Sequence, residues 1–165
     1  MDDQAERIRA AGAALEALRA PLGAGEPWPL SEVWGTEDEA QWGPPEVLAH
    51  TAEMLAYWHA ELARVAAADG SAAVPFGRIA SDPGRLARID RLRRQSTTEL
   101  LDEIRRQIPE VAAFVAGLTV QEAARRGLHQ TRGEMTVADG VERFFANHLD
   151  EHVEQLRTIL ARAPG

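Results

Sequence analysis

The chain has 165 residues, 45% of them hydrophobic and 27% charged, and this size and mixture predict a single globular domain over residues 1–165. Its 26 acidic residues outnumber its 18 basic ones, and the formal charge of −8 argues against a nucleic-acid partner, because phosphate binding needs a basic surface. Cysteine and lysine are both missing from the sequence, which excludes disulfides, thiolate ligands, cysteine nucleophiles and Schiff-base chemistry.

The first predicted helix covers residues 3–20, and Pro21 with the glycines after it is expected to end it. A long ordered loop follows over residues 26–45. This loop carries three of the four tryptophans, and we expect a short helical turn within it at residues 36–41. Long loops in compact domains are often functional, but a simpler interpretation is that the tryptophans cover one end of a helical bundle.

The second predicted helix begins at Pro44, because proline suits the first turn of a helix, and it continues to about Asp69. His50 lies at the edge of its apolar face. A crossover rich in glycine and proline follows over residues 70–84. The segment from Arg85 to Arg94 is predicted to be a short basic helix. Its arginines either bind an anion or form a solvated face paired with acidic neighbours.

A third long helix is predicted over residues 96–118, with Ser96 or Thr97 as its cap. Residues 119–126 are expected to form a short helix and residues 127–133 a loop. No segment alternates apolar and polar residues clearly enough to predict a strand, so no sheet is expected.

The fourth predicted helix covers residues 136–160, and Thr136 with Asp139 can form a capping box at its start. Four long amphipathic helices predict an all-α fold, a four-helix bundle with long crossover loops and short extra helices. Because the sequence shows neither an apolar run of about 18 residues nor a signal peptide, we expect a cytoplasmic protein with no membrane partner.

Three histidines form the candidate metal site. His148 and His152 lie four residues apart within the apolar face of the last helix, so both rings project from one side. Together with His50 they match the three-histidine donor set of catalytic zinc, which nickel or iron also accepts. The alternative is that all three are polar core residues of a non-catalytic bundle.

Two stretches carry a resemblance to a known family. EAQWGPPEVLAHTAEML contains Trp42 and His50, and GEMTVADGVERFFANHLDEHVEQL contains His148 and His152. With these motifs the chain, from about Trp28 onward, resembles the DinB/YfiT-like metalloenzymes.

The resemblance implies an up-down-down-up bundle, usually a homodimer, and a divalent metal ion, nickel or zinc, bound by His50, His148 and His152. Characterised relatives include maleylpyruvate isomerases and S-transferases that use low-molecular-weight thiols such as bacillithiol or mycothiol. The implied activity is therefore a metal-dependent reaction of a thiol (S-transferase) or of water (hydrolase) with a small electrophilic substrate. The missing cysteine agrees with a thiol cosubstrate. A non-catalytic dimeric bundle, acting as a binding or metal-responsive module, remains the alternative.

Four further residues are candidates for the same site. Glu151 is either the general base or a charge on the helix surface. Gln155 lies close to the histidine face and is a candidate either to bind the substrate or to support a histidine that binds the metal ion. His129 either lines the mouth of the site or has a structural role in its loop. Arg78 either binds an anionic substrate or belongs to the solvated surface.

Overall fold

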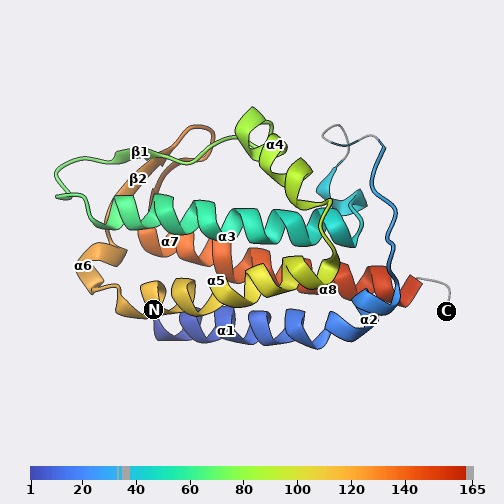
Figure 1. Cartoon of the computed structure of the whole chain (residues 1–165). Helices are drawn as coiled ribbons and strands as arrows, with labels where there is room; N and C mark the ends of the chain where they lie inside the picture. The colour runs from blue at the N-terminus through green and yellow to red at the C-terminus, as the bar shows by residue number, and fades with distance from the viewer. Residues whose placement is uncertain (33, 35–37, 163–165) are drawn as a thin grey trace.

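The computed structural model describes residues 1–32, 34 and 38–162 of the chain. Four long helical segments form a bundle (Figure 1): α1 (Asp2–Ala17), α3 (Pro44–Ala66), α5 (Thr97–Gly117) and a C-terminal segment of α7 (Val137–Val141), η2 (Glu142–Asn147) and α8 (His148–Arg162). α1 and α3 each pack against α5 and against the C-terminal segment. The first and last segments run in one direction and α3 and α5 in the other. This up-down-down-up order confirms the expected bundle.

The capping predicted from the sequence is present at two helix starts. At α5, the Ser96 side chain accepts a hydrogen bond from the Glu99 backbone N–H, and the Glu99 carboxylate accepts one from the Ser96 backbone N–H. Thr136 and Asp139 make the same reciprocal pair at α7. Each box satisfies backbone donors that have no partner inside the helix, and so fixes where the helix begins.

The predicted end of the first helix is wrong. The chain remains helical through α2 (Arg19–Ala24), which contains Pro21. Proline is tolerated there because it occupies the first turn of α2, where a backbone N–H would have no helical acceptor.

The expectation of no sheet is also wrong. The structure has three short strands: β1 (Val74–Phe76), β2 (Arg126–His129) and β3 (Gly133–Thr136). They form one sheet in the order β1–β2–β3, in which β1 is parallel to β2 and β2 is antiparallel to β3. The helix predicted over 119–126 is only α6 (Val120–Ala123), and most of the predicted loop over 127–133 is strand and hairpin turn. Strands of three or four residues are too short to show the alternation that predicts a strand.

The C-terminal segment is not a regular α-helix throughout, because η2 is π-helical. Phe144, Phe145 and Ala146, three successive residues of this π-helical turn, are all buried. The wider π-helical turn accommodates them and shifts the helical phase just before His148. Phe144 stacks on Trp58 of α3, with ring centroids 3.7 Å apart.

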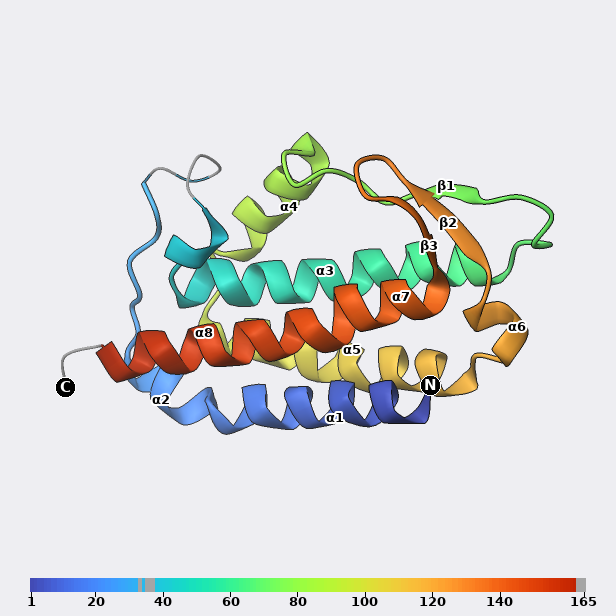
Figure 2. The ribbon, with the colours of Figure 1, turned by 180° about the vertical axis from the view of Figure 1, so that it is seen from behind.

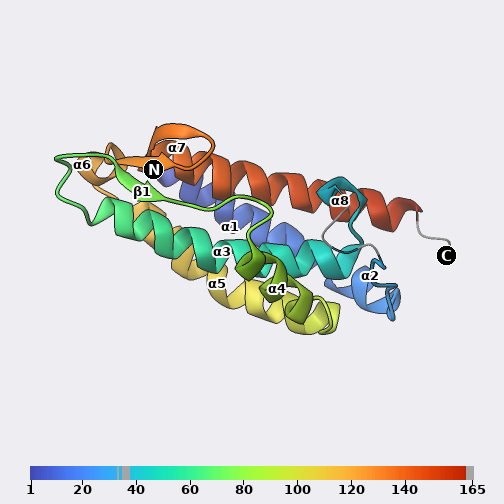
Figure 3. The same cartoon turned by 90° about the horizontal axis from the view of Figure 1, so that it is seen from above.

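The sheet and α4 (Pro83–Leu92) lie on the side of the bundle away from α1. Figures 2 and 3 show the sheet beside α3 and α7, and α4 over α3. η1 (Glu39–Gln41) precedes α3; it falls within the predicted turn at 36–41, of which residues 36 and 37 lie outside the described residues. Among the described residues, no helix is long and apolar enough to cross a membrane.

Candidate metal centre

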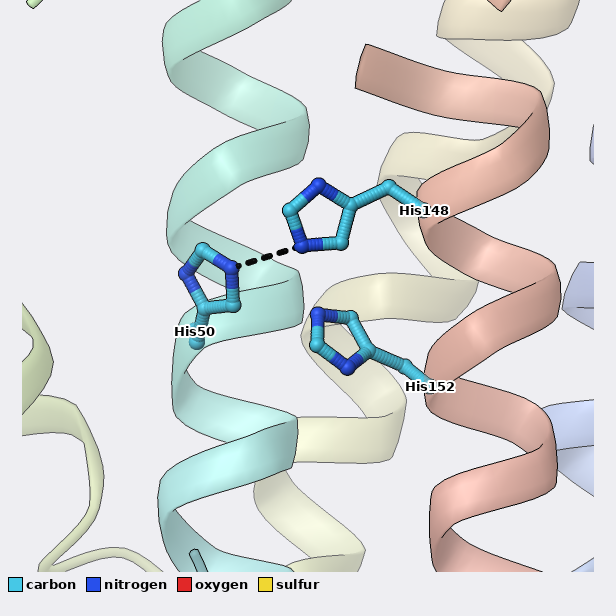
Figure 4. Close-up of side chains that lie close together, drawn as sticks. All are labelled: His50, His148 and His152. Carbon is cyan, nitrogen blue, oxygen red and sulfur yellow. Dashed lines mark hydrogen bonds between the residues drawn. The ribbon is translucent and has the colours of Figure 1, made fainter. Parts of the chain in front are cut away.

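The bundle brings the three predicted histidines together (Figure 4). His50 projects from the first half of α3, and His148 and His152 project toward it from the first two turns of α8. The Nε2 atoms of His50 and His148 are 3.1 Å apart, although the two residues are 98 positions apart in the sequence. One potential ligand atom from each of the three residues lies within 4.8 Å of the other two.

The spacing suits a shared metal ion. Two nitrogens bound tetrahedrally to one zinc ion at about 2.0–2.1 Å lie roughly 3.3 Å from each other. The separation of the two Nε2 atoms is close to that value, so little movement is needed to bind one ion. The Nε2 atom of His152 is buried and has no hydrogen-bond partner among the described residues. Because an unpartnered buried polar atom is costly, this nitrogen is suited to be a ligand.

The tautomer of His152 is set by Gln155. The Nδ1 atom of His152 is 3.1 Å from the Oε1 atom of Gln155, which can only accept, so Nδ1 carries the proton and Nε2 keeps its lone pair. Gln155 is held in turn, because its amide nitrogen donates to the backbone oxygen of Glu39 at 2.7 Å. A hydrogen-bond acceptor behind a metal-binding imidazole commonly orients the ring in this way.

Burial keeps the three rings uncharged near neutral pH. It lowers the pKa of His148 to about 4 and that of His152 to about 4, and nearby positive charge adds to both shifts. The pKa of His50 is also well below its usual value, chiefly through burial and then through the charges of His152 and Arg85. Uncharged imidazoles have a free lone pair, the form in which histidine binds a metal ion.

A cavity of about 450 Å³ adjoins the histidines, a size that suits a small molecule. His50 and His148 form part of its wall, and the predicted residues Arg78, His129 and Glu151 line it as well. Glu151 is exposed and has no hydrogen-bond partner within the described parts of the chain. The structure therefore places Gln155 behind a ring and the other three residues around the cavity.

His129 lies in β2 rather than in a loop. Its ring is buried, 6.0 Å from the Trp58 ring and 6.1 Å from that of Phe144. Its Nδ1 atom accepts a hydrogen bond from the backbone N–H of Thr131 at 3.2 Å, so this histidine joins the hairpin turn to the aromatic core.

Two further residues lie beside His50, and the sequence analysis assigned neither of them to the metal site. Glu39 forms an ion pair with Arg85 and places its Oε2 atom 3.9 Å from the Nε2 atom of His50. Arg85, at the start of α4, is buried, and its Nη2 atom is 3.4 Å from the Nδ1 atom of His50. The solvated-face interpretation of the basic segment is thus wrong for Arg85 and for buried Arg93, which pairs with buried Glu46. The one available signal was Asp82, which caps α4 and fixes the position of Arg85 on the helix.

Comparison with known proteins gives two matches. The family model described as the DinB superfamily matches residues 74–156. The solved structure of YfiT from Bacillus subtilis, described as a probable metal-dependent hydrolase with an unusual four-helix bundle topology, is similar with a TM-score of 0.64. That similarity covers 95% of this chain and 87% of YfiT at 14% sequence identity, so it bears on the fold alone. Among curated proteins, none matches the sequence significantly.

Proposed function

This chain belongs to the DinB superfamily, and we propose that it is a metal-dependent enzyme whose site is formed by His50, His148 and His152. The ion is divalent, nickel or zinc. The reaction adds water, or a low-molecular-weight thiol, to a small electrophilic substrate in the adjoining cavity. The observation that carries this proposal is the convergence of three uncharged imidazoles, one with an unpartnered Nε2 atom, beside a cavity of about 450 Å³.

Hydrolysis and thiol transfer are both supported by specific observations. The description of YfiT as a probable metal-dependent hydrolase supports reaction with water. The complete lack of cysteine supports a thiol that arrives as a cosubstrate, because the chain has no thiol of its own. A divalent ion in this position supplies Lewis acidity and lowers the pKa of a water molecule or thiol that binds it.

The protein's own residues have separate roles in this proposal. Gln155 keeps His152 in the tautomer with a free Nε2 atom. Four carboxylates line the cavity, and three of them are engaged elsewhere: Glu39 by Arg85, Glu142 by Arg7 and Asp139 by the capping box at Thr136. We therefore assign Glu151 as the base that accepts the proton of the nucleophile, and Glu39 with Arg85 as the pair that fixes the His50 side of the site.

The experiment compares protein stripped of metal by a chelator with protein reloaded with zinc or nickel. The probes are nitrophenyl esters for hydrolysis, and an aryl halide with bacillithiol or mycothiol for transfer. We expect turnover only in the reloaded protein, with a loss of about a hundredfold in Glu151→Gln, in the range of general-base effects. Glu154→Gln is the matched control, since Glu154 is an exposed carboxylate on the same helix.

The alternative function is a non-catalytic dimeric bundle that binds a metal ion or ligand as a responsive module. It predicts stoichiometric metal binding without turnover on either class of probe. Size-exclusion chromatography with light scattering measures the proposed homodimer independently of both functions.

A further inference from the structure

Three arginines other than Arg85 line the cavity beside the histidines. Arg78 follows β1, Arg132 lies in the turn between β2 and β3, and Arg143 lies in η2. They come from three separate segments that the fold brings to one space. This convergence concentrates positive charge in a protein whose formal net charge is −8.

Arg78 is held in place before any ligand arrives. One of its terminal nitrogens, Nη2, donates to the carboxylate of Glu53, which is 1% exposed, and its guanidinium lies 3.6 Å from the centre of the Tyr57 ring. Glu53 is the one side-chain acceptor that Arg78 has among the described residues. Because a guanidinium has five N–H donors in a fixed plane, the nitrogens not bound to Glu53 keep free donors.

The other two arginines bring charge that nearby acids do not neutralise. Within the described parts of the chain, neither Arg132 nor Arg143 takes part in an ion pair. Three of the carboxylates that line the cavity are already engaged: Glu39 by Arg85, Glu142 by Arg7 and Asp139 by the capping box at Thr136.

Arg78, Arg132 and Arg143 line the same cavity as His50 and His148, so they border the space beside the candidate metal centre. After burial, the charges of Arg132 and Arg143 also lower the pKa of His129, which lines this cavity as well.

We propose that the wall formed by Arg78, Arg132 and Arg143 binds a carboxylate group of the substrate. A guanidinium fixed on one edge by Glu53 and on one face by Tyr57 leaves a planar edge, which matches a planar carboxylate. The substrate is then a small carboxylate-bearing molecule whose electrophilic part extends toward the histidines. This orientation rests on the proposed function, whereas carboxylate binding itself does not require a metal ion.

The test uses metal-free protein, so that a bound ion cannot hold the ligand. Succinate is titrated into labelled protein, with the uncharged diamide succinamide as a probe of the same length. The readout is the chemical shift of the Trp58 indole, since Trp58 lines the same cavity. We expect saturable shifts with succinate that weaken as salt is added, and little effect of succinamide.

Variants identify the binding wall. Arg132→Gln with Arg143→Gln should weaken succinate binding about tenfold, and both side chains are exposed enough for the fold to tolerate the change. Arg78→Lys keeps the charge but loses the planar edge and should weaken binding severalfold. The control is Arg126→Gln, which removes an exposed arginine of the same hairpin that is paired with Glu134. Equal binding of succinate and succinamide, or unchanged binding in the double variant, would overturn the proposal.

Three further outcomes are informative, and the last two separate this inference from the proposed function. Inorganic phosphate that binds more tightly than succinate would overturn the assignment to a carboxylate. Succinate binding in a protein that never shows metal-dependent turnover would support the anion site and count against the enzyme. Metal-dependent turnover together with no succinate binding would support the enzyme and overturn the carboxylate site.

Discussion

Gln155 lies one turn beyond His152 on α8, and its Oε1 atom accepts a hydrogen bond of 3.1 Å from the Nδ1 atom of His152. Removing this acceptor frees the imidazole to rotate and to change tautomer. Gln155→Ala should therefore lower metal affinity about tenfold, the lower end of the range for such supporting residues. Competition against a chelating dye measures the affinity. Glu154→Ala, on the adjacent exposed position, is the control, and equal affinities in the two variants would contradict this role.

The pair of Glu46 and Arg93 gives a prediction about stability. Both residues are buried, and Arg93 donates to Glu46 at 2.8 Å. Arg93→Ala leaves the carboxylate buried without its partner and should lower the free energy of unfolding by about 3–5 kcal/mol. Arg94→Ala removes the adjacent, largely exposed arginine and should cost less than about 1 kcal/mol. Urea denaturation measures both, and a similar cost for the two variants would show that burial of the pair is unimportant.

Two helical glycines should respond in opposite directions to alanine. A Cβ atom at Gly140 would lie 2.6 Å from the Cδ2 atom of Leu62, which is buried and has little room to move. Gly140→Ala should thus lower the free energy of unfolding by about 1–3 kcal/mol. At Gly117 a Cβ atom would meet nothing within 4 Å, so Gly117→Ala should raise the free energy of unfolding by up to about 1 kcal/mol. Thermal unfolding compares them; stabilisation by Gly140→Ala would contradict the packing described.

His129 predicts part of the pH dependence of stability. Burial, and then the charges of Arg132 and Arg143, lower its pKa, while a hydrogen bond with the Arg78 backbone opposes the shift. As the pH falls below about 6.5, the unfolded chain takes up a proton on this residue before the folded protein does. The free energy of unfolding should therefore fall with decreasing pH in this range. The decrease should be shallower in His129→Gln, as measured by urea denaturation of metal-free protein at several pH values. Parallel curves would exclude His129 as a source of the slope.

The sequence predicts the main helices well, because each is set by local signals. Three helix starts are marked in the sequence and confirmed by the structure. The signals are the capping pairs Ser96–Glu99 and Thr136–Asp139 and the proline Pro44. Features that depend on distant partners were missed. β1 and β2 pair across about fifty residues, and the π-helical turn of η2 reflects the packing of Phe144 on Trp58. Neither leaves a periodic pattern in the sequence.

The candidate site likewise combines residues that local sequence signals predict with residues that depend on distant partners. His148 and His152 are four residues apart on one helix, so their proximity follows from helical geometry. His50 could be added only through the family resemblance and its place at a core edge. Glu39 and Arg85 depend on how the loop before α3 and the helix α4 close over the bundle, and this tertiary arrangement has no local signature. Arg132 and Arg143 escaped notice for the same reason.

The metal content of the purified protein tests the central claim most directly. The protein is dialysed against zinc or nickel and freed of unbound metal. Elemental mass spectrometry should then find about one metal ion per chain. His152→Ala should lose nearly all of it, whereas His59→Ala, which changes a histidine of α3 outside the cluster, should retain it. Metal content near zero in the unmodified protein, or equal content in the unmodified protein and His152→Ala, would contradict a metal site built from His50, His148 and His152.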